Sequence, residues 1–164
     1  MAGRGKLLLA VLLIGSLSVD PAKASPPRKP DKEQDLLARL GRERNPVNKA
    51  KYEVRLARVK LFQAMEAFEK GDPERSRKLL EVYLERLRSA WATLQASGRP
   101  AHRKPQGFKE LDIELREDGR YLEDLTHRFS FLDREPVEKI RQEVDQLRGE
   151  VLRVMFPQEP PKKQ

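Results

Sequence analysis

Apolar residues recur at helical spacing through most of the chain between residues 46 and 156. In the first long segment they alternate in steps of three and four, as one buried face of a helix requires. Asn45 can cap this helix, Pro46 can occupy its first position, and Gly71 ends it. We therefore predict a long helix that buries one stripe, made of Ala50, Val54, Ala57, Leu61, Ala64 and Phe68.

Two other segments show the same pattern. Asp72 and Pro73 mark the start of one helix, which continues to Gly98, and the last helix begins near Asp133 and stops at Pro157. Both segments carry an apolar stripe that must be covered by neighbouring helices. The stripes are Leu80, Leu84, Leu87, Trp91 and Leu94 in the first and Val137, Ile140, Val144, Leu147, Val151 and Val154 in the second.

The segment from 108 to 129 allows two interpretations. A helix that continues across Gly119 would place Leu111, Leu115, Leu122, Leu125 and Phe129 on one face, but it would also place Asp118 on that apolar stripe. Apolar residues also alternate from 111 to 115, and Asp118-Gly119 is typical of a hairpin turn. Because β-branched residues are scarce here, we predict a helix and keep the hairpin as the alternative.

The four segments have similar lengths, and only the connection "SGRPAHRKPQ" at 97–106 is long. We predict an all-α fold, an antiparallel four-helix bundle of two αα-hairpins over 46–156. Residues 25–45 form a Pro-rich linker and a short helix around 31–44 with Leu36, Leu37 and Leu40. The Pro-rich tail at 157–164 is expected to be disordered.

The N-terminus has the order of a secretory signal peptide. Arg4 and Lys6 precede an apolar stretch at 7–19, and Ala22 and Ala24 supply the small residues of a cleavage site. We predict cleavage after Ala24 and a periplasmic or extracellular protein with no stable membrane span, with an uncleaved anchor as the alternative. The chain has no cysteine, so packing alone must hold the exported fold.

The chain is basic, with a formal net charge of +8. Internal neutralisation is the favoured explanation of this charge, because residues 108–126 are acidic and could pack against the basic first helix. The alternative is an anion-binding surface for an anionic envelope polymer or lipid. Secretion, and a loop with no aromatic residue among its cations, argue against nucleic acid. The candidate anion-binding residues are Lys51, Arg55 and Arg58 on the first helix and Arg99, Arg103 and Lys104 in the long connection.

A second apolar stripe lies on the first long helix, roughly opposite the first one. It consists of Tyr52, Leu56 and Val59. A helix that is apolar on two faces must cover both. The short helix with Leu36, Leu37 and Leu40 could fold back over this stripe, or the stripe could be an interface with another protein or a second copy in a homodimer.

The sequence contains few of the residue patterns that catalysis requires. There is no cysteine nucleophile, the only histidines are His102 and His127, and no Gly-rich phosphate loop is present. Asp124 and His127 share a helix face, a pattern more typical of a surface contact than of a metal site. We predict that the protein is not an enzyme and holds no cofactor or metal.

These observations predict a non-enzymatic binding or scaffold protein of the cell envelope. The alternative is a periplasmic chaperone or stress-sensor protein. Size, helicity, basic charge and lack of cysteine are similar to Spy-type periplasmic chaperones. Those proteins carry a Leu-Thr-x-x-Gln motif, whereas here Leu125-Thr126 is followed by Phe129 at the glutamine position.

Overall fold

The structure, a computed structural model, describes residues 32–131 and 133–157. Within these ranges the chain is all-helical, with five helices and no strand. The segment with two interpretations is one continuous helix that passes through Gly119. The signal peptide and the C-terminal tail predicted from the sequence lie outside the described residues. The helices are α1 (Glu33–Arg42), α2 (Pro46–Glu69), α3 (Pro73–Ala96), α4 (Phe108–Arg128) and α5 (Arg134–Met155).

The two capping residues predicted from the sequence begin their helices. The side-chain oxygen of Asn45 accepts a hydrogen bond from the N–H of Val47 at 2.9 Å. Asp72 accepts one from the N–H of Arg75, also at 2.9 Å. Between α2 and α3, Gly71 has a φ of +79°, a conformation that glycine adopts without steric cost. The structure therefore confirms the predicted position of this tight connection.

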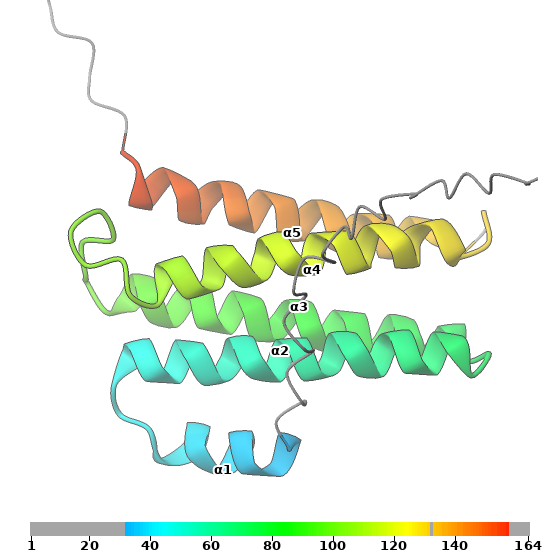
Figure 1. Cartoon of the computed structure of the whole chain (residues 1–164), viewed down its shortest axis with the longest axis horizontal. Coiled ribbons are helices and arrows are strands. Elements are labelled where there is room, and N and C mark those ends of the chain that lie inside the picture. The colour runs from blue at the N-terminus through cyan, green and yellow to red at the C-terminus, as the bar shows by residue number, and fades with distance from the viewer. Residues whose placement is uncertain (1–31, 132, 158–164) are drawn as a thin grey trace, which may run out of the picture.

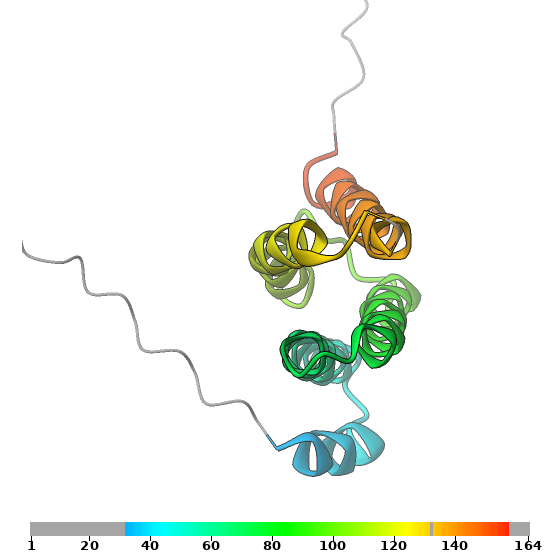
Figure 2. The ribbon, with the colours of Figure 1, turned by 90° about the vertical axis from the view of Figure 1, so that its right-hand side faces the viewer.

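The helices form a bundle in which α2 to α5 lie side by side along one long direction (Figure 1). Seen along that direction, α2 and α3 form one neighbouring pair, and α4 and α5 form another beside it (Figure 2). The short helix α1 packs on the outer side of α2, away from α4 and α5. The connections 43–45 and 97–107 and the C-terminal end of α5 lie at one end of the bundle. The turns 70–72 and 129–133 lie at the other end.

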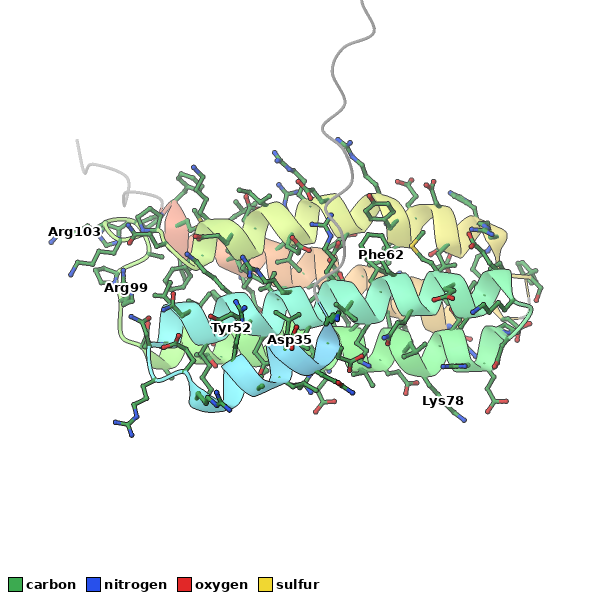
Figure 3. All side chains as sticks on the ribbon, turned by 60° about the horizontal axis from the view of Figure 1, so that its bottom comes forward. Asp35, Tyr52, Phe62, Lys78, Arg99 and Arg103 are labelled. Carbon is green, nitrogen blue, oxygen red and sulfur yellow. The ribbon has the colours of Figure 1, made fainter. Side chains whose placement is uncertain are left out.

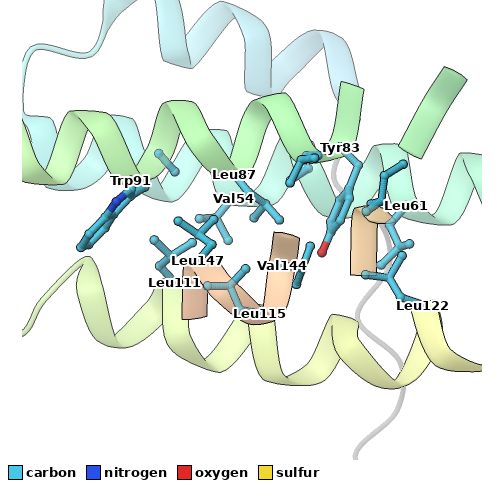
Figure 4. Packing of buried hydrophobic residues seen from close by; sticks show 14 of the residues in the cluster. Val54, Leu61, Tyr83, Leu87, Trp91, Leu111, Leu115, Leu122, Val144 and Leu147 are labelled. Atoms are coloured by element: carbon cyan, nitrogen blue, oxygen red, sulfur yellow. The ribbon is translucent and has the colours of Figure 1, made fainter. Parts of the chain in front are cut away.

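The apolar stripes meet in one core between the four long helices (Figure 4). Nearly every stripe residue predicted from the sequence is buried. Phe68 is only partly buried and packs against the core, with its ring 4.5 Å from that of Phe129. Val154 is an exception, because 39% of it stays exposed in the last turn of α5, where the helix is about to end.

Candidate functional site

Two of the predicted anion-binding residues on α2 are engaged by acids of α4. Lys51 Nζ lies 2.7 Å from an oxygen of Glu110, and Arg58 lies 3.1 Å from Glu114 and 3.2 Å from Glu117. Arg55 also interacts with other groups of the protein. This is the internal neutralisation that the acidic composition of residues 108–126 suggested. The α2 cations therefore stabilise the contact with α4 instead of forming an open anion site.

The other three candidates lie in the 97–107 loop. Arg99 is half-buried and donates a hydrogen bond to the side chain of Gln106 at 3.1 Å. Arg103 and Lys104 are exposed, and their backbone N–H groups both bond the carbonyl of Pro100, at 3.0 and 2.9 Å. Figure 3 shows Arg99 and Arg103 at the end of the molecule, with Arg103 pointing away from it. The six predicted residues thus fall into α2 cations that are engaged within the fold and loop cations, of which Arg103 and Lys104 are exposed.

The loop is held in place by its own buried positions. Ala101 is buried at the edge of the core. Gly107 has a φ of +91°, and a β-carbon on it would lie only 2.6 Å from a side-chain carbon of Leu94. The cations of this loop are therefore carried on a backbone that is anchored at both sides.

Exposed cations from other elements lie at the same end as this loop. They come from the end of α1, the start of α2, the start of α4 and the end of α5. None of them forms an ion pair with another described residue. We call this group the basic end; it consists of Arg42, Arg44, Lys49, Arg103, Lys104, Lys109 and Arg153.

The carboxylates closest to the basic end in sequence already have partners inside the fold. Glu43 accepts the N–H groups of the next two residues at 3.0 and 2.8 Å. Glu150 accepts the indole N–H of Trp91 at 3.0 Å. Burial alone would raise the pKa of Glu110, but hydrogen bonds from Lys51 and from the N–H of Gly107 outweigh it and lower that pKa. Glu43 and Glu150 keep their negative charges, but neither forms an ion pair with a described cation of the basic end.

The opposite end of the bundle has a balanced surface. Most of its cations pair with carboxylates. The lysines pair along their own helices, and the arginines link α2 to α4 and α3 to the start of α5. The pairs are Glu66–Lys70, Glu74–Lys78, Glu69–Arg128 and Arg77–Asp133. Charge is therefore distributed unevenly along the bundle.

The second stripe of α2 faces α1. Glu33 of α1 pairs with Lys60 at 2.6 Å and accepts a hydrogen bond from Gln63 at 3.0 Å, and both partners share the α2 face that carries Leu56. Leu56 is 1% exposed and Leu36 of α1 is also buried. The prediction that Leu56 lies at an interface with another protein needs correction, because α1 of the same chain covers this side chain.

The other two residues of the stripe are less covered. Tyr52 and Val59 are half-buried beside α1, and Figure 3 shows Tyr52 near that helix. Contact of these two residues with another protein or a second copy stays a prediction.

A buried carboxyl group lies at the middle of α4. Asp118 is 0% exposed, and neither of its oxygens has a hydrogen-bond partner within the described chain. The pKa of Asp118 is raised to about 8: burial and the charge of Glu114 raise it, and Arg58 and the nearby Tyr83 hydroxyl partly offset the rise. At neutral pH the group is therefore mostly protonated, as the placement of an aspartate on an apolar stripe would require.

Tyr83 is the polar group that accompanies Asp118. It projects from α3 into the core, with its hydroxyl pointing toward the side of α4 and α5 (Figure 4). It is fully buried, and burial together with the negative charge of Asp118 raises its pKa well above the usual range. Both groups are inaccessible to solvent, so their ionisation affects the stability of the core.

Sequence reasoning missed a second buried acid, Glu53 on α2. Its two oxygens accept hydrogen bonds from Arg86 at 3.1 Å and from Ser89 at 3.3 Å, both on α3. Glu53 is 5% exposed. Its spacing from Ala50 and Ala57, three and four residues, places it on the stripe and could have revealed it.

Comparisons with family models, with curated proteins and with solved structures give no match. Among the described residues, no group of three or more histidine or acidic side chains is arranged to hold a metal ion. In the same ranges, no helix combines the length and the hydropathy that crossing a membrane requires. The candidate site is the basic end, because its cations are exposed and have no ion-pair partner among the described residues.

Proposed function

We propose that this protein is a non-enzymatic scaffold of the cell envelope that binds an anionic partner through its basic end. The observation that carries the proposal is the uneven distribution of charge. Many cations along the length of the bundle, such as Lys51 and Arg58, are paired with acids, whereas all seven cations of the basic end lack an ion-pair partner among the described residues. Clustered charge of one sign attracts polyanions.

The scaffold that we propose is an antiparallel four-helix bundle made of α2 to α5. Short connections at 70–72 and 129–133 and the 97–107 loop support this topology. The chain has no cysteine, so a spin-label pair at Asn48→Cys and Gln95→Cys can be introduced cleanly. Antiparallel packing predicts a short distance between these labels, which sit at the start of α2 and the end of α3. A distance close to the length of a helix would contradict it.

We place the protein outside the cytoplasm, released by cleavage after Ala24. The order of cations, apolar stretch and small residues at positions 1–24 supports this location. A scaffold beginning at Ser25 would meet lipid headgroups and anionic polymers of the envelope.

The test of binding uses the secreted form, residues 25–164, with inorganic polyphosphate as a soluble polyanion. Calorimetric titration at low and at moderate salt should show binding that weakens as salt rises. The double variant Arg103→Gln/Lys104→Gln should bind several-fold more weakly. The matched control, Lys70→Gln/Lys78→Gln, removes two charges from the balanced end and should leave affinity unchanged. Equal losses in both variants would show that only net charge matters and would refute a site.

The chaperone alternative has a separate test. A chaperone of this kind should suppress aggregation of an unfolding client at equimolar concentration, whereas the scaffold that we propose should not.

A further inference from the structure

The C-terminal end of α5 places an exposed aromatic side chain at the same end as the basic residues. Phe156 follows the helix directly, and 68% of it is exposed. Its backbone N–H donates to the carbonyl of Leu152 at 2.8 Å, so the helix itself fixes its position. Val154, two residues earlier, is also exposed, while Met155 between them packs against the core. Met155 thus anchors the end of α5 on the core, while Val154 and Phe156 leave apolar surface exposed.

This apolar group lies beside cations. Arg153 precedes it in the same turn, and the loop with Arg103 and Lys104 lies at the same end of the bundle. A soluble polyanion would be recognised by the cations alone and would leave Phe156 in water. A bilayer surface offers both partners at once, anionic headgroups for the cations and the upper acyl region for an aromatic ring.

We propose that the basic end docks on the surface of an anionic lipid bilayer, with Phe156 entering the headgroup region. This inference rests on the proposed function and names the partner of the same site. In this arrangement the cations supply attraction to anionic lipid, and Phe156 with Val154 supplies the apolar contact. The mode is peripheral, because only the end of the bundle touches the lipid.

Two kinds of variant separate these contributions. Each lysine or arginine near an anionic surface contributes about 1 kcal/mol, or roughly fivefold in affinity. Arg103→Gln/Lys104→Gln should therefore weaken vesicle binding roughly 30-fold. Phe156→Ala should weaken it several-fold by removing apolar contact. The measurement is sedimentation of residues 25–164 with vesicles of phosphatidylcholine alone or mixed in equal parts with phosphatidylglycerol.

The chain supplies matched controls at its other end. Phe131 is 87% exposed in the connection between α4 and α5, where the charges are balanced. Phe131→Ala and Lys70→Gln/Lys78→Gln should leave vesicle binding unchanged. All these side chains are exposed, so the variants should fold and their helix content can be verified by circular dichroism.

A fluorescent version reports the position of the ring directly. Phe156→Trp should shift its emission to shorter wavelength when vesicles containing phosphatidylglycerol are added, and Phe131→Trp should not. The native Trp91 is buried and bonded to Glu150, so it provides a constant background. A shift in the Phe131 variant of the same size as in the Phe156 variant would overturn the assignment of the docking end.

The outcomes distinguish this inference from the proposed function. Binding to vesicles with phosphatidylglycerol, lost in the basic-end variants, supports both. Binding to polyphosphate without binding to those vesicles overturns the bilayer inference and leaves a soluble anionic polymer as the partner. Equal binding to pure phosphatidylcholine vesicles also overturns it, because charge would then play no part. Binding to neither probe overturns both.

Discussion

Replacing Asp118 with asparagine should change how the stability of the protein depends on pH. The side chain keeps nearly the same shape, but it can no longer ionise. In the native protein burial raises the pKa of Asp118 to about 8, far above its ordinary value of 3.8. The folded state therefore holds a proton that the unfolded state releases when the pH is between these two values.

The sign and size of the effect follow from this difference. Below about pH 4 both states hold the proton, and Asp118 contributes no pH dependence. As pH rises toward 8, unfolding releases the proton, so the free energy of unfolding falls by up to about 1.4 kcal/mol per pH unit. Between pH 4 and pH 7 the loss amounts to about 4 kcal/mol. Asp118→Asn lacks this loss and should be the more stable protein at neutral pH.

Urea denaturation followed by circular dichroism from pH 4 to pH 9 measures the effect. Other titratable or charged groups in this part of the core also respond to pH, so the informative quantity is the difference between wild type and variant. They are Arg58 of α2, Tyr83 of α3, Glu114 and Glu117 of α4 and Asp145 of α5. The control is Asp124→Asn, which removes a carboxylate from an exposed position of the same helix. If wild type and Asp118→Asn lose or gain stability in parallel across this range, Asp118 is ionised in the fold and the burial argument is wrong.

Further predictions concern packing, a buried ion pair and export. Gly107→Ala should lower the free energy of unfolding by about 1–3 kcal/mol in urea titrations, because the added carbon would lie 2.6 Å from a buried leucine and the φ of +91° disfavours alanine. Leu36→Ala should speed hydrogen exchange throughout α1, whereas Leu37→Ala, on the exposed side of that helix, should not. Glu53→Ala should cost about 1–3 kcal/mol, since it leaves its α3 partners unpaired, and Glu53→Gln should cost less. Mass spectrometry of the exported protein should find Ser25 as the first residue; retention of residues 1–24 would favour the anchor.

The helices could be predicted from the sequence because each signal for them is local. Asn45 and Asp72 cap helices wherever the flanking residues are helical, and Gly71 ends one. The choice between helix and hairpin near Asp118-Gly119 was harder, because the local turn signal competes with the helical spacing. Packing decided it, since a continuous helix buries all five apolar residues of that stripe.

The candidate site was only partly predictable. Spacing showed that Lys51 and Arg58 share a side of α2, but their pairing with α4 depends on which helices become neighbours. The basic end assembles residues from four helices and two connections, 43–45 and 97–107, and no sequence window contains them together. Phe156 carried no periodic signal, because it lies beyond the last predicted stripe residue.

The length of the bundle gives the bilayer inference a geometric consequence. Helix α2 has 24 residues and so spans about 36 Å, several times the distance of about 8 Å over which charges act at physiological ionic strength. Docking by the basic end would therefore leave the opposite end, with Phe131, outside the field of the membrane. If the bundle stands on its end, the surface potential of the membrane acts only on the basic-end residues. If the bundle lies flat on its α2 side, the paired cations of α2 also reach the lipid. Arg58→Gln separates these orientations: it should leave vesicle affinity unchanged in the upright arrangement and weaken it in the flat one.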